Sequence, residues 1–233
     1  MDDIGICYRF DLSDETAEIF DIYLDGLTLE VVKSEDIEKP EWAKLEFKQC
    51  SHCPLTSNTH PYCPVAVNLS GVIGRLGNIC SHDELDLEVT TKERKFLAHT
   101  TAQRAISSML GLLIATSGCP YTNFLKPMAR FHLPLASDED TIFRAVGMYL
   151  QAQYFLRKDG KEEDLSLKGL TKIYENLHQL NNMIAERIRY SALKDAPVNA
   201  LILLDLFTSL MPFVIEDHLD EIRFLYEPYF SQS

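Results

Sequence analysis

Residues 48–67 read KQCSHCPLTSNTHPYCPVAV, and this stretch holds three of the chain's six cysteines. Cys50 and Cys53 form a Cys-x-x-Cys pair, which lets two thiolates on one tight turn bind the same metal ion. Nine residues separate Cys53 from Cys63, and His60 stands before Cys63 at the same two-residue spacing. The pattern predicts a structural zinc site with Cys50, Cys53, Cys63 and His60 as its four ligands.

Other residues can be the fourth ligand, and other chemistry fits the same stretch. The remaining candidates for the fourth position are His52, Cys80, Cys119 and His132. Prolines follow Cys53 and Cys63, a step that also occurs beside iron–sulfur ligands. An iron–sulfur or thiol redox sensor, completed by Cys80 or Cys119, is therefore the first alternative to zinc. A further interpretation leaves these cysteines as small buried side chains without metal.

Composition limits the classes of protein to consider. The chain has 233 residues, 46% of them hydrophobic, which is enough for one compact domain or two small ones. Its formal net charge of −13 disfavours binding to nucleic acid or to anionic membranes. The first residues show no basic segment followed by an apolar one, so we expect no secretory signal. Unevenly spaced cysteines then favour a reducing cytoplasm.

The cysteine stretch divides the chain, since apolar residues alternate at period two before it and follow helical spacing after it. The alternation predicts antiparallel strands at residues 7–12, 18–24 and 27–31, with turns at 13–16 and at Asp25-Gly26. Residues 42–47 indicate another strand after a polar loop at 33–41, and residues 86–90 a short one that returns to the sheet. The N-terminal region therefore predicts a small antiparallel sheet with a cysteine-rich loop.

The remaining chain predicts a helical bundle. Pro64 suits the first position of a helix with Cys63 at its N-cap. Thr90 and Glu93 form a capping-box pattern that predicts a helix to about residue 116, and Ser137 with Asp140 predicts one to about 158. Further helices are expected at 165–190, at 197–211 and from a break at Pro212 to about 226. We therefore expect an α+β fold, with the sheet region at 1–90 packed on a helical bundle at 91–233.

The apolar run at residues 196–215 invites a membrane interpretation. Asn199 and Asp205 interrupt the run, and Pro212 lies within it, so a buried core helix is the better prediction and no membrane insertion is expected. A carboxylate on such a helix requires a partner or a raised pKa. Arg104, Arg130 and Arg144 are the candidate partners of Asp205.

A second candidate site lies in the helical half. Cys119, Arg130 and His132 fall in or beside a proline-flanked loop, and loops of this kind can line pockets with residues such as Asp205. The common nucleotide-binding, hydrolase and zinc-protease motifs are missing from the sequence. An enzyme with a pocket here is therefore the second alternative, and it has no motif to support it.

Several motifs together resemble a known family. They are Tyr8-Arg-Phe, Leu24-Asp-Gly-Leu-Thr-Leu29, Cys50-x-x-Cys-Pro-Leu55, Tyr62-Cys-Pro-Val-Ala66, Thr116-Ser-Gly-Cys-Pro120, Met128-Ala-Arg-Phe-His-Leu-Pro134 and Tyr149-Leu-x-Ala-Gln-Tyr154. The set is similar to a family of uncharacterised bacterial proteins defined as a domain of unknown function. The resemblance implies a bacterial cytoplasmic protein and brings no activity. The expected function is a non-enzymatic, zinc-stabilised cytoplasmic module that binds a protein partner or a small ligand.

Overall fold

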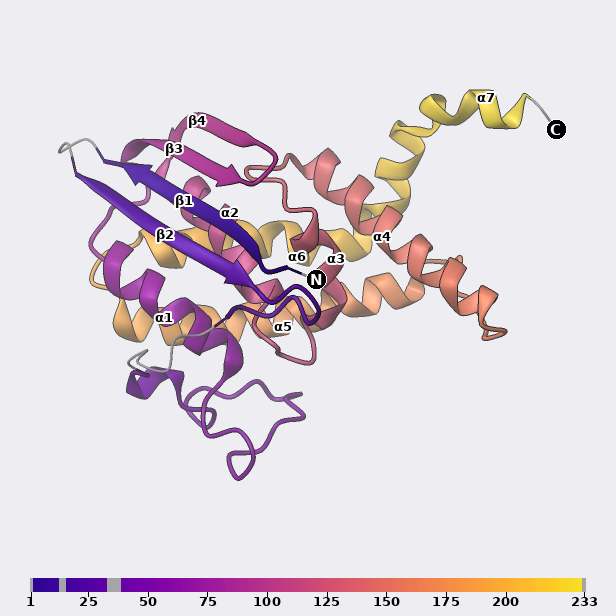
Figure 1. Cartoon of the computed structure of the whole chain (residues 1–233). Helices are drawn as coiled ribbons and strands as arrows, with labels where there is room; N and C mark the ends of the chain where they lie inside the picture. Colours follow the sequence, from indigo (N-terminus) through magenta and orange to yellow (C-terminus); the bar gives the residue numbers. More distant parts are fainter. Residues whose placement is uncertain (1, 13–15, 33–38, 232–233) are drawn as a thin grey trace.

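A computed structural model describes residues 2–12, 16–32 and 39–231 of the chain. An antiparallel sheet with strand order β2-β1-β3-β4 comes from the N-terminal part, and a helical half follows it (Figure 1). The α+β class predicted from the sequence is confirmed. Residues 13–15 of the expected first turn and 33–38 of the expected polar loop lie outside the described residues.

The sheet follows the alternation of apolar residues. Strands β1 (Ile4–Asp11) and β2 (Ala17–Leu24) are where period two predicts them, and β3 (Glu84–Thr91) contains the predicted strand at 86–90. Tyr8 and Phe10 are fully buried on one face of β1, because successive side chains in a strand point to opposite faces. That face packs on the helices and brings Tyr8 to the helical half.

Two predicted strands do not form. Residues 27–31 make only an isolated bridge between Val31 and Leu24, because the Asp25 carboxylate accepts the backbone N–H groups of Leu27 and Thr28 and closes the chain into a turn. Residues 42–47 begin instead in a 3-10 helix, η1 (Glu41–Ala43). Backbone carbonyls in this segment bond to an arginine side chain from a distant helix rather than to a neighbouring strand.

The capping-box pattern at Thr90 and Glu93 does not start a helix. The chain turns there, with the Thr91 N–H donating to the Arg94 carbonyl at 2.9 Å, and returns as β4 (Lys95–Thr101). The Lys95 ammonium lies 2.7 Å from the Glu88 carboxylate of β3. Pairing with β3 outweighs the local helix signal, so α2 (Ala102–Ala115) begins about ten residues later than predicted.

Other helix starts follow the predicted rules. Helix α1 (Pro64–Leu76) has Cys63 at its N-cap and proline at its first position. Helix α4 (Asp138–Lys158) begins with a complete capping box, in which the Asp140 N–H donates to Ser137 Oγ and the Ser137 N–H donates to Asp140 Oδ2. The remaining helical segments are η2 (Asn123–Leu125), α3 (Lys126–Arg130), α5 (Lys168–Ser191), α6 (Ala196–Glu221), η3 (Arg223–Tyr226) and α7 (Glu227–Phe230).

Helix α6 differs from the expected buried helix with a break at Pro212. It continues through Pro212 to Glu221, since contacts with α2 and α5 offset the lost backbone hydrogen bond. Only 28% of its most apolar 18-residue window is buried, and Leu206 and Phe213 are exposed. By length and composition alone, α6 is a helix that can cross a membrane, and many core helices of soluble proteins meet the same criterion.

The buried apolar residues form two hydrophobic cores, and helices α5 and α6 contribute to both. The first lies between the sheet, α1, α2 and parts of α5 and α6, and includes Cys63 and Cys119. The second lies between α4 and other parts of α5 and α6, and includes Ile142 and Met211. Leu125 packs against both cores. Because the two cores do not merge, the boundary between them leaves room for a cavity.

Candidate functional site

The cysteine loop, which we define as residues 48–63, lies below α1 in Figure 1, and its C-terminal end pairs with residues 43–44. The Cys63 N–H donates to the Ala43 carbonyl at 2.8 Å, and Lys44 and Tyr62 form an isolated bridge. Within the loop, the Cys53 N–H donates to the Cys50 carbonyl at 3.0 Å. That bond closes the Cys-x-x-Cys segment into the tight turn expected from its spacing.

A distant segment brings Cys119 to this loop. After α2 the chain turns through Gly118, whose φ of 82° suits glycine, and reaches Cys119-Pro-Tyr121. The Tyr121 hydroxyl donates to the His52 carbonyl at 2.6 Å, and the two rings lie 4.3 Å apart. Since His52 stands between Cys50 and Cys53, this contact holds Cys119 beside the Cys-x-x-Cys turn.

The four thiols act on one another electrostatically. Burial raises the pKa of Cys119 to about 12, partly offset by a bond to the Tyr121 backbone, and charge on Cys63, Cys50 and Cys53 would raise it further. Burial likewise raises the pKa of Cys50 to about 11, and charge on Cys63 and Cys53 adds to the effect. The Arg187 guanidinium lowers the pKa of Cys50 by less than burial raises it, so without a bound metal ion Cys50 and Cys119 are protonated at neutral pH.

Arg187 lies near three of these thiols, those of Cys50, Cys53 and Cys63, and is 1% exposed. Its Nη1 donates to the carbonyls of Trp42 and Lys44, each at 2.7 Å, and its Nη2 to the Leu45 carbonyl at 2.9 Å. Burial lowers the pKa of Arg187, while charge on Cys63, Cys50 and Cys53 would raise it.

No carboxylate of the described residues balances the charge of Arg187. Within the described parts of the chain, no carboxylate forms an ion pair with it, and its Nε has no hydrogen-bond partner. Arg187 is not among the predicted site residues. Its position three residues after Ile184, on the apolar stripe of α5, is the signal that marks it as buried.

The predicted fourth ligand, His60, lies apart from this group. It is exposed, and its Nδ1 is 3.0 Å from the Thr59 hydroxyl. Cys80 lies beyond the other end of α1, where its N–H donates to Asp83. Across residues 2–12, 16–32 and 39–231, no three cysteine, histidine or acidic side chains already stand where they could hold a metal ion. The fold gathers four thiols without setting them in coordination geometry.

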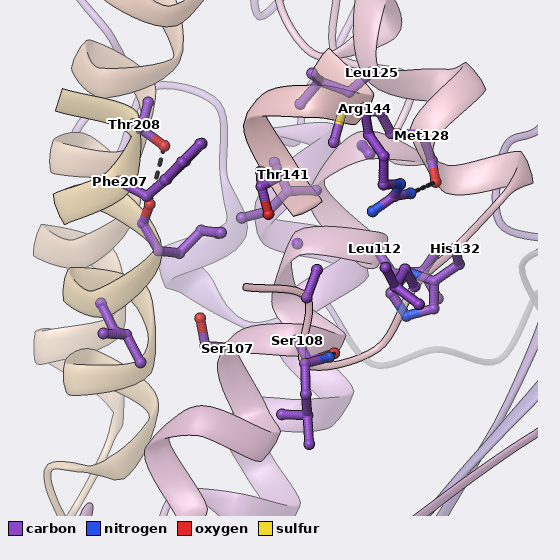
Figure 2. A pocket seen from close by; sticks show the side chains of 18 of the residues that line it. Ser107, Ser108, Leu112, Leu125, Met128, His132, Thr141, Arg144, Phe207 and Thr208 are labelled. Carbon is purple, nitrogen blue, oxygen red and sulfur yellow. Dashed lines mark hydrogen bonds between the residues drawn. The ribbon is translucent and has the colours of Figure 1, made fainter. Parts of the chain in front are cut away.

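A cavity of about 660 Å³ opens between α2, residues 125–144, α5 and α6 (Figure 2). Its volume is in the range of small-molecule sites. His132 lines it, with Nε2 2.5 Å from the Tyr8 hydroxyl, which in turn is 3.1 Å from the Ser108 hydroxyl. Burial lowers the pKa of His132 to about 3, and Arg144 acts in the same direction, so the imidazole is neutral.

The predicted pocket residues do not converge. His132 lines the cavity, but Arg130 is exposed with its guanidinium over the Phe131 ring, and Cys119 lies with the other cysteines. Asp205 pairs with His178 at 2.9 Å and with Asn181 at 3.1 Å, and not with the arginines expected as its partners. Cys119, Arg130, His132 and Asp205 therefore do not form one site.

We expect His132 to make stability depend on pH. Its pKa in the folded chain, about 3, lies below the ordinary 6.5, so the unfolded chain takes up the proton first as the pH falls. The free energy of unfolding should decrease by roughly 1 kcal/mol per pH unit below about pH 6.5. Urea unfolding of His132→Gln between pH 7 and 4.5 should lack this component. The exposed His60→Gln is the matched control, and equal pH dependence in both variants would contradict the assignment.

One family model, described as a domain of unknown function (DUF6901), matches residues 6–227. No curated protein and no solved structure matches the chain. The match runs from β1 to the first residue of α7, so it includes the sheet, the cysteine loop and the helices around the cavity.

Proposed function

Since the chain belongs to DUF6901, a family defined as a domain of unknown function, we propose from its own residues that it is a non-enzymatic, zinc-stabilised binding module. The ligands proposed are Cys50, Cys53, Cys63 and Cys119, with Cys119 in place of His60. Four thiolates are a common ligand set of structural zinc. Such a site requires reduced cysteines, and we therefore place the protein in the cytoplasm.

The observation that carries the proposal is the buried charge of Arg187 near Cys50, Cys53 and Cys63. A buried cation is unfavourable unless an anion compensates it. Zinc with four thiolates has a net charge of −2, which would more than offset the single positive charge of the guanidinium where no carboxylate of the described residues does. Metal binding would thus explain why the fold places a full positive charge in this position.

The same arrangement explains what the metal would do for the fold. Thiolates rather than thiols bind zinc, so binding would release the protons that burial keeps on Cys50 and Cys119. Since no three donors among the described residues are in position in advance, binding would draw the four side chains together. The bound ion would then join the cysteine loop to the segment after α2 and add its binding energy to folding.

An iron–sulfur centre is the second candidate, and a specific observation favours it. With Cys119 in place of His60, all the proposed ligands are cysteines, and proline follows Cys53, Cys63 and Cys119. Four cysteines also hold iron–sulfur clusters, and a proline after the ligand recurs in them. The cysteine loop would then be a redox sensor.

Elemental analysis and an optical spectrum of the anaerobically purified, untagged protein test the proposal. We expect about one zinc per chain and no visible absorbance, as for a single zinc ion held by four thiolates. Iron with acid-labile sulfide and visible absorbance would establish the second candidate. A colourless protein without metal would contradict both.

A further inference from the structure

Arg144 places a cation in the cavity wall that forms no ion pair with a described carboxylate, although Asp140, four residues earlier on α4, acts on it through its charge. Its Nη2 donates to the carbonyls of Met128 and Phe131, each at 2.8 Å. Figure 2 shows the guanidinium between Thr141 and His132, with another nitrogen directed to the space between them. In the described part of the chain, no carboxylate forms an ion pair with Arg144, because that of Asp140 is bonded to Ser137.

Two uncharged polar side chains, His132 and Ser107, also line the cavity. His132 is uncharged at neutral pH, and its Nε2 is already bonded to the Tyr8 hydroxyl. Ser107 is buried and lines the cavity, and its hydroxyl has no hydrogen-bond partner among the described residues. Figure 2 shows its hydroxyl pointing toward the cavity. Arg144 and Ser107 thus offer donors to a ligand, one charged and one neutral.

The rest of the cavity wall is largely apolar. Leu112 from α2, Leu177 from α5 and Leu204 and Phe207 from α6 line it, and the cavity volume is about 660 Å³. This surface cannot solvate a second charge on a ligand, but it can take an aliphatic or aromatic group. A ligand that matches both the Arg144 guanidinium and the apolar wall has one anionic end and an apolar body.

We propose that this cavity binds a free monocarboxylate with an apolar tail, its carboxylate on Arg144. A carboxylate matches the planar donor fork of arginine. Arg104 and Arg144 line the cavity together with Asp138, so the charged groups of the wall sum to about +1 and favour a ligand with a single negative charge, while the chain's net charge of −13 opposes a polyanion. The inference uses none of the cysteines, so it is independent of the metal site.

Three ten-carbon probes test the proposal on the wild-type protein: decanoate, 1-decanol and decyltrimethylammonium. Titration calorimetry below the micelle-forming concentration should find decanoate bound at least about tenfold more tightly than decanol, as expected for hydrogen bonds to a charged donor. The quaternary ammonium should show no binding. Decanoate that does not bind, or binds no better than decanol or the cation, would overturn the proposal.

Two variants locate the site. Arg144→Met should lower decanoate affinity to that of decanol and leave decanol binding unchanged. Gly111→Leu should remove binding of both probes, because it fills the cavity from α2, where a Cβ meets only Leu204 Cδ1 at 3.7 Å.

Arg130→Gln is the matched control, since Arg130 is a nearby exposed arginine outside the cavity wall. It should bind decanoate like the wild type. If Arg144→Met does not fold, Gly111→Leu and Arg130→Gln still show whether decanoate binds in the cavity. Wild-type decanoate affinity in Gly111→Leu, or an equal loss in Arg130→Gln, would show that the carboxylate binds elsewhere.

Discussion

Replacing Arg187 with methionine should lower the free energy of unfolding by about 3–5 kcal/mol, because three backbone carbonyls lose their donor and an unsatisfied buried polar group costs about 1–3 kcal/mol. Methionine fills a similar volume but donates no hydrogen bond. The carbonyls of Trp42, Lys44 and Leu45, which accept from the guanidinium in the wild type, would then lack their donor. The segment before the cysteine loop would lose the hydrogen bonds that join it to Arg187 on α5.

Urea unfolding of the purified variants measures this effect. Arg189→Met is the matched control, because Arg189 lies two residues further along α5 and forms a surface pair with Glu186. We expect the control to change the free energy of unfolding by no more than about 0.5 kcal/mol. Arg187→Lys should fall between the two, since lysine keeps the charge but not the planar fork. Wild-type stability in Arg187→Met would refute the role assigned to this residue.

Cys119→Ser should weaken metal binding by roughly a hundredfold or more, about one ligand's share of the binding energy of a four-ligand zinc site. His60→Ala should bind metal as the wild type does. The physical reason is their placement: Cys119 is held beside the Cys-x-x-Cys turn by the Tyr121 hydroxyl, whereas His60 is exposed beside Thr59. Competition with a chromophoric chelator under anaerobic conditions gives the affinities.

Cys80→Ser controls for the loss of any cysteine. Cys63 stands at the N-terminal end of α1, whereas Cys80 follows its C-terminal end. It should keep wild-type metal affinity. Loss of metal in His60→Ala together with its retention in Cys119→Ser would restore the ligand set predicted from the sequence and exclude the one proposed from the fold.

Local sequence signals predicted the elements whose partners are also local. The Ser137 capping box forms because both of its hydrogen bonds lie within four residues. Thr90 and Glu93 have the same spacing, but the residues after them form strand β4, which pairs with β3. The four-residue capping-box pattern carries no information about that pairing. Helix signals thus fail where a longer-range pairing competes.

The candidate metal site likewise combines residues that the local sequence identifies with residues that only the fold brings together. Cys50, Cys53 and Cys63 are close in sequence, so spacing alone identifies them as a group. Cys119 joins them through the contact between Tyr121 and His52, which are 69 residues apart, and no local pattern distinguishes it from Cys80. Arg187 had a detectable signal, because it continues the apolar stripe of α5 at a position where an arginine must be buried.

X-ray absorption at the edge of the bound metal, on anaerobically purified protein, tests the central claim most directly. A zinc site made by Cys50, Cys53, Cys63 and Cys119 predicts four sulfur ligands at about 2.3 Å and no nitrogen shell. Three sulfurs with one imidazole nitrogen at about 2.0 Å would instead support a site of three cysteines and one histidine. A protein that purifies without metal and binds none on titration would contradict the account.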